Sequence, residues 1–154
     1  MATSLVVAGG PTAKNVTVTI DRVKQLDDLD KSTPMISKDR ADFYVQIWIN
    51  GRLWTSQNLS TDDGRPDWSF TVPVTTRTAN IRIKLLDDDG GLEKRDDYVD
   101  VNPKANKKDL NLKFDTQTGK ITGDVSGRKG QTLQSKGKYD SSQGQIWFTV
   151  SETH

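Results

Sequence analysis

Apolar and polar residues alternate with a period of two along most of the chain between residues 16 and 150. In one clear case Phe43, Val45, Ile47 and Ile49 alternate with polar or amphipathic neighbours. Such alternation is typical of strands that bury one face and expose the other. The pattern predicts eight strands, which cover approximately residues 16–23, 43–49, 52–57, 68–74, 81–85, 98–102, 110–114 and 146–150.

The connections between these strands favour an antiparallel arrangement. Asn50-Gly51 is a two-residue hairpin signal, because both central positions of the tight turn need a positive φ. No stretch has the 3.6-residue periodicity of an amphipathic helix. We therefore predict an all-β fold, an eight-stranded antiparallel β-sandwich.

Two regions lie outside this pattern. Residues 1–14 hold only Leu5, Val6 and Val7 as possible strand material and are predicted to be an N-terminal extension to a single domain that spans residues 15–154. Residues 115–144 are rich in Gly, Ser, Thr and Lys, with Ile121 and Val125 as the main apolar positions. They are predicted to form a long polar connection with at most one short strand, an unusual feature in a compact domain.

Composition excludes several classes of function. There is no cysteine, and His154 is the only histidine, so thiolate zinc sites, His-ligated catalytic zinc and a Ser-His-Asp triad are not expected. No apolar run exceeds four residues, which predicts no transmembrane helix. The net charge is +1, and the basic residues after position 100 are dispersed without interleaved aromatic residues, so nucleic acid is not an expected partner.

The acidic residues are strongly biased, because 19 of the 21 are Asp. Asp favours turns and loops, and eleven of them fall within residues 27–42 and 87–100. Two carboxylates in close contact repel each other by roughly 4 kcal/mol at an effective dielectric constant of 20, so converging acidic loops favour a cation. Ligation by oxygen alone selects a hard cation, and loop-borne Asp with backbone carbonyls suits Ca²⁺ better than Mg²⁺.

The alternative is that Asp residues only shape turns or face solvent. We prefer this interpretation for five of them: Asp62, Asp63, Asp115, Asp124 and Asp140. An EF-hand that begins at Asp87 is excluded, because its sixth position is Leu92 instead of Gly and its twelfth is Tyr98 instead of Glu.

Four stretches together resemble the C2 domain, a β-sandwich family that binds calcium and phospholipid. They are Val16–Val23 leading to Leu29-Asp30, Ala41-Asp42-Phe43-Tyr44-Val45, Arg65-Pro66-Asp67-Trp68-Ser69-Phe70, and Leu85-Leu86-Asp87-Asp88-Asp89 with Arg95-Asp96-Asp97-Tyr98-Val99. Each motif alone is weak, but their order and spacing are specific. The resemblance covers approximately residues 16–114 and favours the second circular-permutation topology of the family.

The resemblance implies a site for two Ca²⁺ ions, with a third as an option. Its side-chain ligands would be Asp30, Asp42, Asp87, Asp89 and Asp97, and its backbone carbonyl ligands would come from Leu29 and Asp88. The first loop is long, so that Asp27 or Asp28 is an alternative to Asp30, and Asp39 is a further candidate ligand.

The resemblance also implies association with anionic phospholipid membranes through the loop tips. The candidate membrane contacts are apolar and basic residues of two loops: Met35, Ile36, Leu92, Lys94 and Arg95. Apolar residues suit shallow interfacial insertion, and basic neighbours attract an anionic leaflet. The chain is expected to be a monomeric domain, either alone or within a longer protein.

Two other functions remain open. Calcium with a purely structural role would suit an extracellular adhesion or carbohydrate-binding module, for which Trp48 and Trp54 would have to share a face. We prefer the interpretation that all four Trp residues contribute to packing. Paired Asp residues can also act as acid and base in glycoside hydrolysis. Bound Ca²⁺ would keep them ionised, so we predict no enzyme activity.

Overall fold

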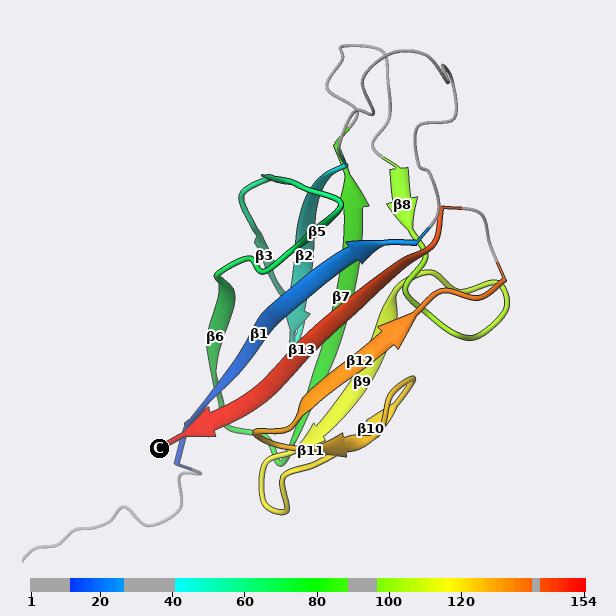
Figure 1. Ribbon diagram of the computed structural model, residues 1–154. Helices are drawn as coiled ribbons and strands as arrows, with labels where there is room; N and C mark the ends of the chain where they lie inside the picture. Colours follow the sequence, from blue (N-terminus) through cyan, green and yellow to red (C-terminus); the bar gives the residue numbers. More distant parts are fainter. Residues whose placement is uncertain (1–11, 27–40, 89–96, 140–141) are drawn as a thin grey trace, which may run out of the picture.

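Two antiparallel β-sheets pack face to face in the computed structural model, which describes residues 12–26, 41–88, 97–139 and 142–154 (Figure 1). The first sheet contains β12 (Thr132–Lys136), β13 (Gly144–Thr153), β1 (Lys14–Gln25), β6 (Trp68–Val74) and β5 (Asp63–Gly64). The second contains β11 (Gly127–Arg128), β10 (Lys120–Gly123), β9 (Leu110–Asp115), β7 (Thr78–Asp87), β2 (Asp42–Ile49), β3 (Arg52–Thr55), β4 (Leu59–Ser60) and β8 (Asp97–Val99). The predicted all-β sandwich is confirmed.

The strand order places β1 at the centre of the first sheet. It pairs with β13 on one side and with β6 and β5 on the other, all antiparallel. In the second sheet β7 pairs with β2 along one edge and with β9 and then β8 along the other. The β2–β3 hairpin turns at Asn50 and Gly51, which have the predicted positive φ values of 48° and 79°.

The core lies between the two sheets and follows the alternation in the sequence. Buried and more exposed residues alternate along β2 and along most of β1, β7 and β13, and Trp68 is buried at the start of β6. The largest fully buried side chains include Phe43, Phe114 and Phe148. Burial of these apolar faces is the main driving force that holds the sheets together.

The segment 115–144 differs from its prediction as a long polar connection. It contains β10, β11 and β12, and β12 forms one edge of the first sheet beside β13. The sequence of β12 shows no apolar alternation, because one of its two buried positions is Ser135 and only the other is apolar, Leu133. The Ser135 hydroxyl donates to the Val101 carbonyl at 2.6 Å. A buried serine thus takes the place that an apolar residue would mark.

The strand predicted at residues 98–102 is shorter than expected. Regular pairing with β7 is limited to Asp97–Val99. Asp100 forms an isolated parallel bridge with Gln143 instead, and Asn102 donates its side-chain amide to the Asp109 carbonyl and to Asp124. The chain leaves the sheet here because these buried polar groups find partners outside the ladder.

Candidate functional site

The end of β7 and the start of β2 meet at one end of the sandwich. Phe43 is opposite Asp87 in the register, and the Asp42 backbone N–H donates to Asp87 Oδ1 at 2.8 Å. The apolar stretch before Asp87 keeps β7 in the sheet up to this residue, so the carboxylate is only 7% exposed. A largely buried carboxylate is thereby fixed beside the first residue of β2.

A second carboxylate is placed opposite the first by strand β8. The register pairs Asp87 with Asp97, and directly opposed residues of an antiparallel pair have Cβ atoms about 4.5–5.5 Å apart. Like charges at opposed positions destabilise a sheet. This pair is therefore an electrostatic cost that a cation between the carboxylates would relieve.

Asp88 is fixed at the same end by two hydrogen bonds. Its backbone N–H donates to the Asp42 carbonyl at 2.9 Å, and its Oδ2 accepts a hydrogen bond from Asn58 Nδ2 at 2.7 Å. Asn58 was not expected at the site. A lone amide in a short polar stretch carries no sequence signal, and only the pairing of β4 with β2 brings it near Asp88.

The described residues that border segments 27–40 and 89–96 come together here. Leu26 donates its N–H to the Gln143 carbonyl at 2.9 Å, and the Gly144 N–H donates to the Asp100 carbonyl at 2.9 Å. The end of β1 is thus linked to the chain that follows β8. Figure 1 shows these strand ends together with the start of β2 and the end of β7.

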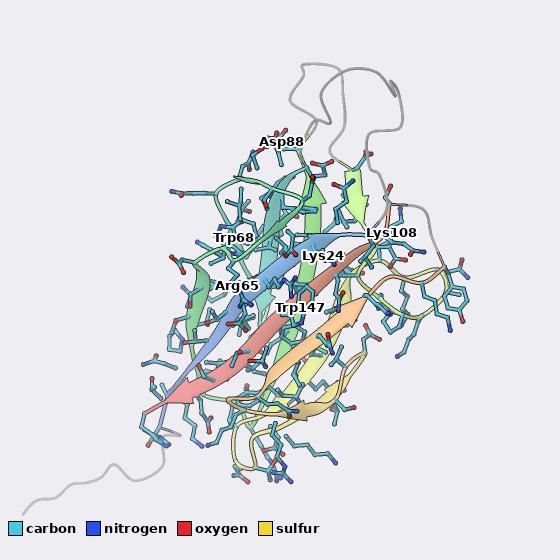
Figure 2. All side chains as sticks on the ribbon, viewed as in Figure 1. Lys24, Arg65, Trp68, Asp88, Lys108 and Trp147 are labelled. Carbon is cyan, nitrogen blue, oxygen red and sulfur yellow. The ribbon has the colours of Figure 1, made fainter. Side chains whose placement is uncertain are left out.

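Only part of the predicted calcium site lies within the described residues. The structure brings Asp42, Asp87, Asp88 and Asp97 to one end of the sandwich, where Figure 2 labels Asp88. The other predicted ligands lie outside the described residues: Asp28, Leu29, Asp30, Asp39 and Asp89. So do all the predicted membrane contacts: Met35, Ile36, Leu92, Lys94 and Arg95.

The described part of the site offers oxygen ligands and no nitrogen or sulfur. Within residues 12–26, 41–88, 97–139 and 142–154, no three acidic or histidine side chains are placed so as to hold a metal ion. The described carboxylates alone therefore do not form a metal site. A site at this end of the sandwich would need ligands from outside the described residues.

Three acids that were expected only to shape turns or face solvent form ion pairs with residues distant in the sequence. A hydrogen bond from Arg22 holds the pKa of Asp63 below its ordinary value, with distances of 2.7 and 2.6 Å to the two carboxylate oxygens. The Thr118 backbone N–H and the Arg77 side chain likewise lower the pKa of Asp115. The third acid, Asp124, lies between Lys104 and the start of β9.

The Asp124 carboxyl experiences opposing effects. Its burial would raise the pKa, but hydrogen bonds from Lys104 and from the Asn111 backbone N–H, with the charges of Lys104 and Lys107, outweigh burial and lower it. Asp124 Oδ1 accepts from Lys104 Nζ at 2.8 Å, and Oδ2 accepts from the Asn111 N–H at 2.8 Å. This contact joins the loop after β8 to β9 and β10.

Trp48 and Trp54 do not share a face, as the adhesion or carbohydrate-binding alternative would require. Neighbouring positions in the β2–β3 register pair Trp48 with Leu53 and Ile47 with Trp54, which places the two indoles on opposite faces of the sheet. Trp54 stacks on Phe70 at a centroid distance of 5.9 Å and packs against the core. Trp48 lies on the outer face beneath Arg82.

Comparison with known proteins finds no match to a protein-family model or to a curated protein sequence. Solved structures do match. A C2 domain has a TM-score of 0.56 at 12% identity, over 92% of this chain and 99% of that chain. The calcium-bound C2A and C2B domains of extended synaptotagmin 2 give 0.55 at 13% identity, over 92% of this chain and 46% of that chain.

Human GIVD cytosolic phospholipase A2 also matches, with a TM-score of 0.55 at 15% identity over 95% of this chain. The chain spans 17% of the length of that enzyme. These likenesses establish that the chain has the fold of C2 domains. The pairing of β1 with β6 and β13, while β2 lies in the other sheet, agrees with the second topology. Within the described residues no helix is long and apolar enough to cross a membrane.

Proposed function

We propose that this chain is a calcium-binding module without catalysis of its own, which associates with anionic phospholipid membranes when Ca²⁺ is bound. The observation that carries the proposal is the pairing of Asp87 with Asp97 at the end of the sandwich, with Asp42 hydrogen-bonded to the same carboxylate. Opposed carboxylates are costly without a cation, and an all-oxygen set suits Ca²⁺.

The proposed ligands combine the described carboxylates with residues of the two bordering segments. Asp87 and Asp89 would bridge two Ca²⁺ ions, with Asp30, Asp42 and Asp97 completing the side-chain set. The carbonyls of Leu29 and Asp88 would add backbone ligands, with Asp28 as an alternative to Asp30 and Asp39 as a further candidate ligand. In support, the strand ends that border both segments converge, and the matching domains of extended synaptotagmin 2 were solved with calcium bound.

The proposed membrane contacts are residues of the same two segments. Met35, Ile36 and Leu92 would insert shallowly at the interface, where apolar side chains are stabilised. Lys94 and Arg95 would add about 1 kcal/mol each of attraction to an anionic leaflet. Bound Ca²⁺ would neutralise most of the negative charge of the aspartates, which otherwise repel the same leaflet.

The test is co-sedimentation with phosphatidylserine vesicles in Ca²⁺ and in chelator. We expect the chain to sediment with vesicles only in Ca²⁺ and to lose this property in Asp87→Asn. Ile36→Ser with Leu92→Ser should weaken sedimentation and leave Ca²⁺ binding intact, whereas Leu53→Ser, at an exposed apolar residue of β3, should change neither. Equal sedimentation in Ca²⁺ and chelator would contradict the proposal.

Because Trp48 and Trp54 lie on opposite faces of the sheet, they do not form the shared aromatic surface that the adhesion or carbohydrate-binding alternative with structural calcium would use. Calcium with a purely structural role would appear in the same experiment as Ca²⁺ binding without any vesicle association. The two functions are therefore separated by one set of samples.

A further inference from the structure

A pocket of about 470 Å³ lies on the outer face of the second sheet, over β2, β7, β9 and β10. Pockets that take small molecules measure about 300–1,000 Å³. The register places Trp48, Arg82 and Asn111 side by side on three adjacent strands of this face. The aromatic, amide and basic side chains that line it are Trp48, Asn80, Arg82, Asn111 and Lys113.

The pocket is remote from the candidate calcium site. Trp48 is six residues along β2 from Asp42, and Arg82 is five residues along β7 from Asp87. A strand rises about 3.3 Å per residue, so the two sites are roughly 17–20 Å apart along the sheet. Ligand binding in this pocket therefore does not need Ca²⁺, and it does not rest on the function proposed above.

One wall of the pocket is the Trp48 ring, which is packed against an arginine that is itself fixed by an ion pair. The Arg82 guanidinium lies 4.6 Å from the centroid of the half-buried Trp48 ring, and Arg82 Nε donates to Asp109 Oδ2. These contacts fix the indole before a ligand arrives, which lowers the entropic cost of binding. A flat aromatic face is complementary to a ligand with an apolar face of its own, such as the C–H face of a pyranose ring.

Two amides supply polar contacts beside this wall. Asn80 and Asn111 are both exposed, and their backbones are fixed, since the Asn80 N–H donates to Asn50 Oδ1 at 2.9 Å and the Asn111 N–H to Asp124 Oδ2 at 2.8 Å. Neither side-chain amide makes a hydrogen bond to any residue that the structure describes. An amide has two donors and an acceptor, which match the neighbouring hydroxyls of a sugar.

The positive charge in the pocket favours a ligand that carries one negative charge. Arg82 is balanced by Asp109, and the described part of the chain contains no ion pair with Lys113. Lys84 lies two residues further along β7, opposite Gln46. Its ammonium lies 3.6 Å from the centroid of the Tyr98 ring. One uncompensated positive charge remains, which suits a monovalent carboxylate better than a phosphate with two charges.

We infer that this pocket binds an acidic sugar, a uronate unit of a polysaccharide. The pyranose ring lies against Trp48, its hydroxyls contact Asn80 and Asn111, and its carboxylate pairs with Lys113. The chain thus has a saccharide site on the face of the second sheet, separate from the end of the sandwich where the aspartates gather.

The probes that test this are tri-galacturonate and tri-mannuronate, each titrated into the full chain in chelator and again in Ca²⁺. Calorimetry gives the affinity, and the indole N–H signal of Trp48 in two-dimensional NMR spectra reports the location. We expect at least one uronate probe to bind with the same affinity, within twofold, in both buffers and to shift the Trp48 signal. The neutral galacto-trisaccharide should bind at least tenfold more weakly.

Variants at exposed positions then distinguish binding in the pocket from attraction by the overall charge of the chain. Lys113→Gln should weaken uronate binding at least tenfold and Asn111→Ala about fivefold, whereas Lys136→Gln, which removes the same charge from the outer face of the other sheet, should change it less than twofold. The inference is overturned if neither uronate shifts the Trp48 signal or if Lys113→Gln binds as the parent does. Binding of inositol trisphosphate in preference to both uronates would also overturn it.

Discussion

The Asp42 backbone N–H donates to Asp87 Oδ1 at 2.8 Å, although 45 residues separate them in the chain. This hydrogen bond joins the first residue of β2 to the last residue of β7 and holds a largely buried carboxylate at the end of the sandwich. The aspartates of two sequence windows are thus brought together by sheet register and not by loop conformation alone. Substitutions that disturb this end of the sheet should change calcium binding even when they remove no ligand.

Asn58 gives a direct test of that idea. Its side chain fixes Asp88, whose carbonyl is one of the proposed calcium ligands. We expect Asn58→Ala to lower the apparent Ca²⁺ affinity about tenfold, the size typical of residues that orient a ligand. Calorimetric titration with Ca²⁺ measures this, with Gln57→Ala at the exposed neighbouring position as control. Equal affinities in both variants would mean that Asn58 does not position the site.

The lowered pKa of Asp124 predicts how the stability of the fold depends on pH. Because its pKa is lower in the folded chain than in the unfolded one, the ionised carboxylate stabilises the fold above the unfolded value of about 3.9. That contribution is lost as the pH falls through the lower, folded value. Asp63 and Asp115 have lowered pKa values and act in the same direction. The free energy of unfolding should therefore be steady above about pH 5 and fall below about pH 4.

The variant Asp124→Asn isolates this contribution. The Asp124 side chain is only 4% exposed. The uncharged asparagine would lose the charge-assisted hydrogen bonds from Lys104 and from the Asn111 N–H. We expect a loss of about 1–3 kcal/mol at pH 7 and a weaker acid dependence, measured by urea unfolding across pH. Asp67→Asn, which removes an exposed carboxylate, serves as control. An unchanged acid dependence in Asp124→Asn would contradict the assignment.

Leu133 tests whether segment 115–144 is part of the packed fold. It is 5% exposed on β12 and belongs to the core. Leu133→Ala should lower the free energy of unfolding by about 2–4 kcal/mol, because it removes buried apolar surface and leaves a cavity. The exposed neighbour Thr132→Ala should change it by less than about 0.5 kcal/mol. Similar small losses in both variants would show that the segment is only a connection.

The alternation of apolar residues was sufficient to predict most of the sandwich. Val16, Val18 and Ile20 of β1 and the inward residues of β2 and β7 are buried as expected, because strands that bury one face must alternate. Asn50-Gly51 also has the positive φ values that a tight hairpin requires. These features depend on local preferences and on a single periodicity, which the sequence displays directly.

Features that depend on contacts between distant residues could not be predicted. Ser135 is buried because the Val101 carbonyl accepts its hydroxyl, and Asp100 leaves the ladder to pair with Gln143. Both are polar residues whose burial depends on a partner far along the chain. The opposite faces of Trp48 and Trp54, in contrast, could have been predicted, because a two-residue turn at Asn50-Gly51 pairs Trp48 with Leu53.

The most direct test of the central claim is thermal unfolding with millimolar Ca²⁺, with Mg²⁺ and with chelator. A ligand at a hundredfold its Kd stabilises by about 2.7 kcal/mol per site, which corresponds to a rise in Tm of about 5–10 °C for a chain of this size. We predict that rise with Ca²⁺ and not with Mg²⁺, and its loss in Asp87→Asn/Asp89→Asn but not in Asp67→Asn. An identical Tm in Ca²⁺, Mg²⁺ and chelator would contradict the account.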